Sequence, residues 1–294
     1  MGCRLGMKTG QWLLVCALFA WLSGCGHSTR SPVDRERMQL TQQGFVEFSA
    51  LPNIKAWLKH AAIADERQAS KVLQVYLEGD GAPWWGQRLP PLDPTPSTSV
   101  SLPLALGDTH DRVAYLGRPC QYLTTLARQS CPVEWWTSGR WSEPVIALTQ
   151  QMLDRLLQAS GARELVLTGH SGGGTLALLV AARREDVRCV LTLASPLDLH
   201  AWAKVQRVEA PQHSLNPADE LVLRTRMQTR HLQGAKDRVV PPESVGRYRD
   251  RLEPGQVVTV PNLGHVQGWV NWWHGHGDEQ VGLNAWFQQC LKPV

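Results

Sequence analysis

The sequence lacks several features that mark whole classes of protein. It has no internal repeat, no long low-complexity tract and no cluster of basic residues. The first absence argues against a repeat array, and the third leaves little support for a nucleic-acid-binding role. Beyond the N-terminal segment, no apolar run is long enough to span a bilayer, which argues against a protein with several membrane spans.

The composition is that of a globular domain. The chain has 294 residues, of which 43% are hydrophobic, and its net charge is +4. This is enough apolar material for one large core, and it fits a single α/β domain as well as two small ones. Removing Arg4 and Lys8 together with the N-terminus would leave a net charge of +2.

The N-terminus has the pattern of an export signal. Arg4 and Lys8 precede the apolar stretch "WLLVCALFAWL" (12–22), and small residues follow it. The run "LSGC" resembles the lipobox of bacterial lipoproteins, which implies that Cys25 is lipidated and becomes the first mature residue. We therefore predict a lipoprotein signal over 1–24, a polar tether over 25–43, and anchoring in the cell envelope, on the periplasmic side of a bacterial membrane. The alternative is an ordinary signal peptide that happens to end in a cysteine.

Four further cysteines follow Cys25. Cys120 and Cys131 lie in the turn-rich segment "RPCQYLTTLARQSCP", and export would permit them to form a disulfide. We favour this bridge over two free thiols. Cys189 lies inside the buried-strand pattern "VRCVLTLA", where a small hydrophobic residue would suffice.

Apolar runs alternate with segments of helical periodicity from residue 71 onward. This alternation is typical of a parallel sheet with helices on both faces, with functional groups in the loops that follow the strands. The segment 45–61 is ambiguous between strand and helix, and the connection over about 199–229 is long enough for a small helical cap. We predict one α/β domain over 44–294, with strand patterns in 71–81 (running into a loop), 111–117, 164–169, 187–198, 229–237 and 256–265, and helices around 102–106 and in 142–160, 173–185, 243–252 and 284–291.

The stretch "GHSGG" (169–173) places Ser171 between one of these strands and the helix that follows it. A G-x-S-x-G motif in this setting is a nucleophile elbow, in which a sharp bend exposes the serine hydroxyl and the glycines make room for close packing. The backbone N–H of Gly172, at the start of the helix, then points to where an oxyanion would form. The alternative is a plain turn serine in an inactive homologue.

A serine hydroxyl needs a base to accept its proton, and the base needs an acid to orient it. His265 follows the last predicted strand and Asp237 follows the strand before it, so we assign them these two roles. His170, His274 and His276 are rival bases, and Asp198 is the alternative acid. His274 and His276 could suggest a metal site, but two ligands without a third are weak evidence, and we predict neither a metal nor a cofactor.

At these residues the chain resembles the α/β-hydrolase superfamily, over roughly residues 71–291. The resemblance implies the order Ser, Asp, His for the catalytic residues and a mostly parallel sheet. The pieces "YLEGDG", "DPTP" and "YLGRPCQY" are also similar to a group of exported bacterial hydrolases.

The family also implies a second oxyanion donor in the loop after the first strong strand. Here that loop begins "EGDG" (78–81), where the lipase-type variant carries His-Gly, so we predict the N–H of Asp80, or that of Gly81, as the donor. A carboxylate pointing toward a developing oxyanion would be unfavourable. We therefore expect the Asp80 side chain to turn away or to bind a substrate cation.

The function predicted from these observations is that of a serine hydrolase acting on a small-molecule carboxylic ester or thioester through an acyl-enzyme. Two alternatives remain: a non-catalytic envelope lipoprotein that uses the same fold for binding, and a peptidase or amidase. The sequence does not identify the acyl or leaving group.

Overall fold

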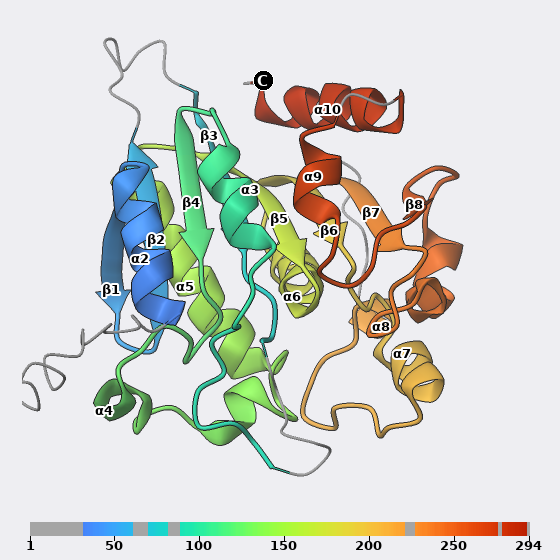
Figure 1. Ribbon diagram of the computed structural model, residues 1–294, viewed down its shortest axis with the longest axis horizontal. Coiled ribbons are helices and arrows are strands. Elements are labelled where there is room, and N and C mark those ends of the chain that lie inside the picture. The colour runs from blue at the N-terminus through green and yellow to red at the C-terminus, as the bar shows by residue number, and fades with distance from the viewer. Residues whose placement is uncertain (1–31, 61–69, 82–88, 221–226, 276–277, 293–294) are drawn as a thin grey trace, which may run out of the picture.

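One eight-stranded sheet runs through the domain, and Figure 1 shows it in a computed structural model that describes residues 32–60, 70–81, 89–220, 227–275 and 278–292. The strand order is β1-β2-β4-β3-β5-β6-β7-β8. β2 is antiparallel to both of its neighbours, and every other adjacent pair is parallel. The strands are β1 (Phe45–Leu51), β2 (Ile54–His60), β3 (Val72–Leu77), β4 (Arg112–Leu116), β5 (Glu164–His170), β6 (Val187–Leu193), β7 (Gln228–Gly234) and β8 (Val257–Val260).

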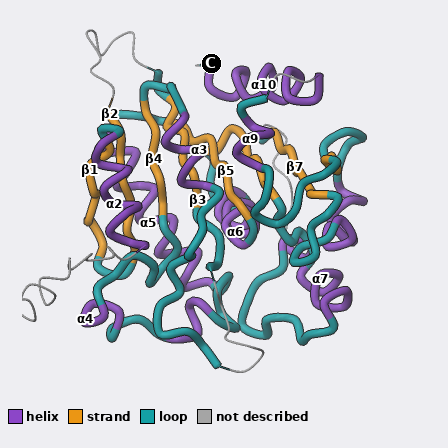
Figure 2. Tube along the Cα trace, viewed as in Figure 1, coloured by secondary structure: helices purple, strands orange, loops and turns teal. Residues whose placement is uncertain are grey.

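Helices cover both faces of this sheet (Figure 2). The long helix α5 ends at Ser160 because Gly161 takes the left-handed conformation, with φ 67°. The α-helices are α2 (Pro32–Gln42), α3 (Ser101–Gly107), α4 (Thr125–Arg128), α5 (Glu143–Ser160), α6 (Gly172–Ala181), α7 (Leu199–Gln206), α8 (Pro217–Glu220), α9 (Trp269–Trp273) and α10 (Asp278–Leu291), and the 3-10 segments are η1 (Val133–Trp136) and η2 (Pro242–Arg251).

The buried apolar side chains form one core on each face of the sheet. On one face, α5 and α6 pack against side chains of β2, β3, β4 and β5. On the other, α3 and α10 pack against the alternate side chains of the same sheet, together with Leu40 of α2 and Trp269 of α9. The predicted α/β class, with a mostly parallel sheet covered on both faces, is confirmed. The ambiguous segment 45–61 supplies the antiparallel hairpin of β1 and β2.

Helix α2 lies inside the segment that we expected to be a tether. Leu40 has an exposed fraction of 0% and contributes to the core, so α2 packs on the domain through this side chain and through Glu36. The polar composition of this segment concealed a helix that buries only a few side chains. Cys25, the predicted lipidation site, lies outside the described residues.

One further expectation needs correction in the C-terminal half. The segment 243–252 is a 3-10 segment broken at Gly246, which has φ 49° and ψ −140°. A Cβ there would lie 2.5 Å from the Asp198 carboxylate, so the close approach of α7 requires glycine at this bend. The predicted cap contains two short helices, α7 and α8. Within the described residues no helix is both long and apolar enough to cross a bilayer.

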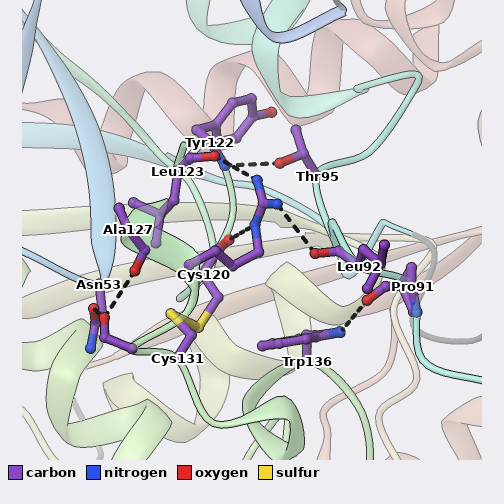
Figure 3. The surroundings of a disulfide bond; sticks show 12 residues. Asn53, Pro91, Leu92, Thr95, Cys120, Tyr122, Leu123, Ala127, Cys131 and Trp136 are labelled. Carbon is purple, nitrogen blue, oxygen red and sulfur yellow. Dashed lines mark hydrogen bonds between the residues drawn. A yellow bond between two sulfur atoms is a disulfide. The ribbon is translucent and has the colours of Figure 1, made fainter. Parts of the chain in front are cut away.

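Two disulfides join described residues. Cys120 pairs with Cys131 as predicted, and Figure 3 shows the bridge among the side chains that fasten residues 91–95 to this segment. Arg128 contributes to this fastening by donating to the Leu92 carbonyl and pairing with the Asp93 carboxylate.

Cys189 also forms a disulfide, with Cys290 on α10, so our interpretation of Cys189 as only a small hydrophobic residue is wrong. The buried-strand pattern around Cys189 is real, since its exposed fraction is 2%. The pattern does not reveal which residue packs across from it, 101 positions away. In the chain-entropy model, closing a loop of about 100 residues contributes about 5 kcal/mol.

Candidate active site

Ser171 occupies a strained bend between β5 and α6. Its backbone has φ 54° and ψ −130°, a region that non-glycine residues rarely adopt and that costs of order 1–3 kcal/mol. The bend is held because the Ser171 N–H donates to the Leu193 carbonyl at 2.8 Å, which fixes the elbow to the end of β6. A Cβ at Gly169 or Gly173 would lie 2.4 or 2.3 Å from backbone atoms. Glycine is therefore required at both positions.

The Ser171 side chain is partly exposed and forms no hydrogen bond with any described residue. The N–H of Gly172, the first residue of α6, is likewise left without a partner within the described part of the chain. A hydroxyl nucleophile and a free N–H at a helix N-terminus therefore lie side by side.

His265 and Asp237 form the expected pair. His265 Nδ1 lies 2.8 Å from Asp237 Oδ2, and the other carboxylate oxygen accepts the N–H groups of Val239 and Val240, each at 2.8 Å. Because an ionised carboxylate only accepts hydrogen bonds, Nδ1 of His265 carries the proton. Nε2 therefore keeps its lone pair, as a base requires.

The backbone of His265 is held beside the elbow by two donors. His170 Nε2 lies 2.7 Å from the His265 carbonyl oxygen, and Trp269 Nε1 donates to the same oxygen at 3.1 Å. The His170 and His265 rings are 5.0 Å apart between centroids, which places the candidate base next to the residue that precedes Ser171. Burial, followed by the charge of His265, lowers the pKa of His170 to about 3. His170 is therefore neutral near neutral pH and helps to position His265, which leaves His265 as the candidate base.

The remaining rivals lie elsewhere. Asp198 caps the N-terminus of α7, where its side chain accepts the N–H groups of His200 and Ala201, and it makes no contact with His265. The His274 ring lies against Gly107 of α3. His276 lies outside the described residues, and within them no three metal-ligating side chains gather.

The loop after β3 brings the second predicted oxyanion donor to the elbow. A Cβ at Gly79 would lie 3.5 Å from Ser171 Cβ, so this loop adjoins the nucleophile. The N–H of Asp80 has no partner among the described residues. Gly81, with φ 69°, packs so closely on residue 94 that a Cβ would lie 2.1 Å from the Pro94 carbonyl oxygen. Of the two candidates, Asp80 is next to Gly79 and is the better placed.

The Asp80 carboxylate departs from our expectation. It does not turn away from the elbow. It is also not free to bind a substrate cation, because Arg118 and Arg140 both pair with it. Both arginines are distant in sequence from Asp80. Arg118 lies in the segment singled out for its cysteines, but no local pattern around either arginine indicates that it pairs with Asp80.

The comparisons with known proteins agree with this fold. A family model described as the alpha/beta hydrolase fold matches residues 22–219, a range that contains Ser171 and ends before Asp237 and His265. The search of curated proteins finds no match.

Several solved structures are similar at low sequence identity. Est1E from Butyrivibrio proteoclasticus has a TM-score of 0.53 and 11% identity, over 84% of this chain and 98% of that one. A membrane phospholipase A described as a bacterial virulence factor has a TM-score of 0.54 and 18% identity, over 96% and 99%. A puromycin-hydrolyzing peptidase from Mycobacterium tuberculosis has a TM-score of 0.50 and 17% identity, over 84% and 40%. These likenesses support the fold, and together with the family model they lead to one conclusion: the chain belongs to the alpha/beta hydrolase fold family.

Proposed function

We propose that this protein is a serine hydrolase that cleaves a carboxylic ester or thioester through an acyl-enzyme. The observation that carries the proposal is the hydrogen bond of 2.8 Å between His265 Nδ1 and Asp237 Oδ2, formed beside a serine held at positive φ. A turn serine in an inactive protein would not require a strained backbone, an oriented imidazole and a buried carboxylate in one place.

The proposed reaction follows from these roles. His265 Nε2 accepts the proton of Ser171 as Oγ attacks the carbonyl carbon, and the imidazolium is stabilised by Asp237. The N–H groups of Gly172 and Asp80 donate to the tetrahedral oxyanion. His265 then protonates the leaving group. A water molecule, deprotonated by the same imidazole, attacks the acyl-enzyme and releases the acid.

A panel of p-nitrophenyl esters of increasing chain length, assayed with the purified chain, tests this proposal. We expect ester hydrolysis together with one fluorophosphonate adduct per molecule. Activity on aminoacyl anilides but not on esters would favour a peptidase. Absence of both turnover and adduct would contradict the proposal and leave a binding protein on the same fold.

We further propose that the protein is exported and anchored to a bacterial membrane through lipid on Cys25. The first described helix, α2, runs antiparallel to β1, so its N-terminal end lies toward the end of the sheet at which β4, β3 and β5 stop (Figure 1). Ser171 follows β5 at that end. Residues 26–31 can span at most about 20 Å. Anchoring at Cys25 would therefore keep the candidate site close to the lipid surface.

Replacing Cys25 with serine is expected to remove lipid labelling and to release the protein from the membrane fraction. The measurement is metabolic incorporation of a palmitate analogue, with membrane fractionation of the producing cells. Cys16→Ser is the matched control, because Cys16 lies in the segment that cleavage would remove. Equal labelling of the Cys25 variant and the unaltered chain would rule out this anchor.

A further inference from the structure

Asp80 places a charged group against one wall of the candidate oxyanion hole. A Cβ built on Gly172 would lie 2.0 Å from Asp80 Oδ1, so the carboxylate packs directly on the Gly172 backbone. The backbone N–H of Asp80 is the free donor on the opposite side of the hole. An uncompensated carboxylate here would oppose the formation of a negative tetrahedral intermediate.

Two buried arginines compensate this carboxylate. Arg118 Nη1 pairs with Oδ1, and Arg140 Nε lies 3.0 Å from Oδ2. Each arginine is 4% exposed. Two guanidinium groups against one carboxylate give these three side chains a net charge of +1. The neighbouring Glu78 carboxyl, which also acts on Arg118, is buried, and burial raises its pKa. Burial lowers the pKa of both arginines, but both remain charged near neutral pH.

Burying these three charged side chains lowers the stability of the fold unless their pairing offsets the lost hydration. Taking three charges out of water carries a large desolvation penalty, and apolar replacements of similar size often stabilise a fold equally well. Arg118 Nε is moreover buried without a hydrogen-bond partner in the described structure. Stability alone therefore gives a weak reason for placing these side chains together.

The two segments that carry Arg118 and Arg140 also hold both sides of the candidate oxyanion hole by neutral hydrogen bonds. Trp141 Nε1 donates to the Gly172 carbonyl at 2.8 Å, while its neighbour Arg140 holds Asp80. Gln121 Nε2 donates to the Gly79 carbonyl at 2.9 Å, and its side-chain oxygen accepts the N–H of Arg118. The segments that follow β4 and η1 thus fix Gly172 on one side and the 79–80 loop on the other.

We infer that Asp80, Arg118 and Arg140 form a buried charge cluster that positions the N–H of Asp80 as the second oxyanion donor, while the two arginines offset the Asp80 carboxylate. The inference rests on the proposed hydrolase function. The three side chains are positioning residues, and only the backbone N–H of Asp80 contacts the reacting atoms. The cluster acts in the transition state, so its loss lowers kcat and leaves KM nearly unchanged.

The test compares Asp80→Asn, Arg118→Met and Arg140→Lys with Arg112→Met. Arg112 is 1% exposed, lies at the opposite end of β4 from Arg118, and donates to the carbonyl groups of Ser160 and Ser70. It therefore controls for the loss of a buried arginine away from the site. For each variant, kcat and KM are measured on the best p-nitrophenyl ester, the rate and final extent of fluorophosphonate labelling are recorded, and thermal unfolding is followed.

We expect Asp80→Asn and Arg118→Met to lower kcat by roughly 10- to 100-fold, somewhat less than removing an oxyanion donor outright, with KM changed by less than about 3-fold. Their labelling should be slow but reach the same final extent. Arg140→Lys keeps the charge and loses the planar donor, so we expect a loss of roughly 3- to 10-fold in kcat. Arg112→Met should lose stability and keep kcat.

Three outcomes distinguish a failure of the proposed function from a failure of the inference on the charge cluster. If the unaltered chain neither turns over nor becomes labelled, the proposed function itself has failed. If it is active and folded Asp80→Asn keeps kcat, or changes only KM, the cluster does not position the oxyanion donor. Should Asp80→Asn fail to fold, unchanged kcat in folded Arg140→Lys would overturn the inference.

Discussion

Ser171→Ala is expected to reduce ester turnover by about 10⁴- to 10⁶-fold, because without Oγ no acyl-enzyme can form. Residual catalysis would come from the oxyanion donors and from substrate positioning alone. The fold should be retained, since alanine pays the same cost as serine for the positive φ at this bend. The measurement is kcat on the best p-nitrophenyl ester, with intact mass after fluorophosphonate treatment.

Ser195→Ala provides the matched control for this variant. Ser195 lies near the elbow, but it is fully buried and its hydroxyl donates to the Leu193 carbonyl at 3.1 Å. Its loss should leave the labelling at Ser171 intact. A fluorophosphonate adduct that persists in Ser171→Ala would show that another residue is the nucleophile and would remove the basis of the proposed mechanism.

Asp237→Asn is expected to lower kcat by about 10⁴-fold with the fold intact. Oδ1 of Asp237 accepts two backbone N–H groups, so an asparagine must place its amide oxygen there. Its NH2 group would then face His265 Nδ1, donor against donor. The imidazole would move its proton to Nε2, which would remove the lone pair that accepts the Ser171 proton.

Asp198→Asn distinguishes the two candidate acids. Asp198 accepts the N–H groups of His200, Ala201 and Arg247 and the amide of Asn216. Its substitution should lower the melting temperature, because the capping of α7 and its packing against η2 depend on this carboxylate, while kcat of the folded protein changes little. If instead Asp198→Asn lost activity and Asp237→Asn kept it, the assignment of the acid would be wrong.

The parts of the fold that depend on local pattern could be predicted from the sequence. Strand β5, the bend at Ser171 and helix α6 follow one another within 18 residues, and each has its own signal in apolar runs and glycines. The pairing of Asp237 with His265 could be predicted because each lies in a loop that follows a strand, Asp237 after β7 and His265 after β8. In a parallel sheet, the positions that follow strands meet at one edge.

The parts that depend on distant partners could not be predicted. Arg118 and Arg140 reach Asp80 across 38 and 60 positions, and Cys189 meets Cys290 across 101. No periodic pattern in the sequence indicates which of these distant residues pair with one another. Helix α2 escaped detection for a different reason: its side chains are mostly polar, and fully buried Leu40 is too little to make an apolar stripe.

The Cys189–Cys290 bridge closes a covalent ring that contains two of the three candidate catalytic residues. Asp237 and His265 lie within the covalent ring that it closes, and Ser171 lies outside the ring, upstream of Cys189. A single peptide-bond cut anywhere between the two cysteines would therefore leave the acid, the base and the nucleophile on one connected molecule. In an oxidising compartment, a protease that attacked the connection between β6 and β7 would nick this protein without separating its pieces.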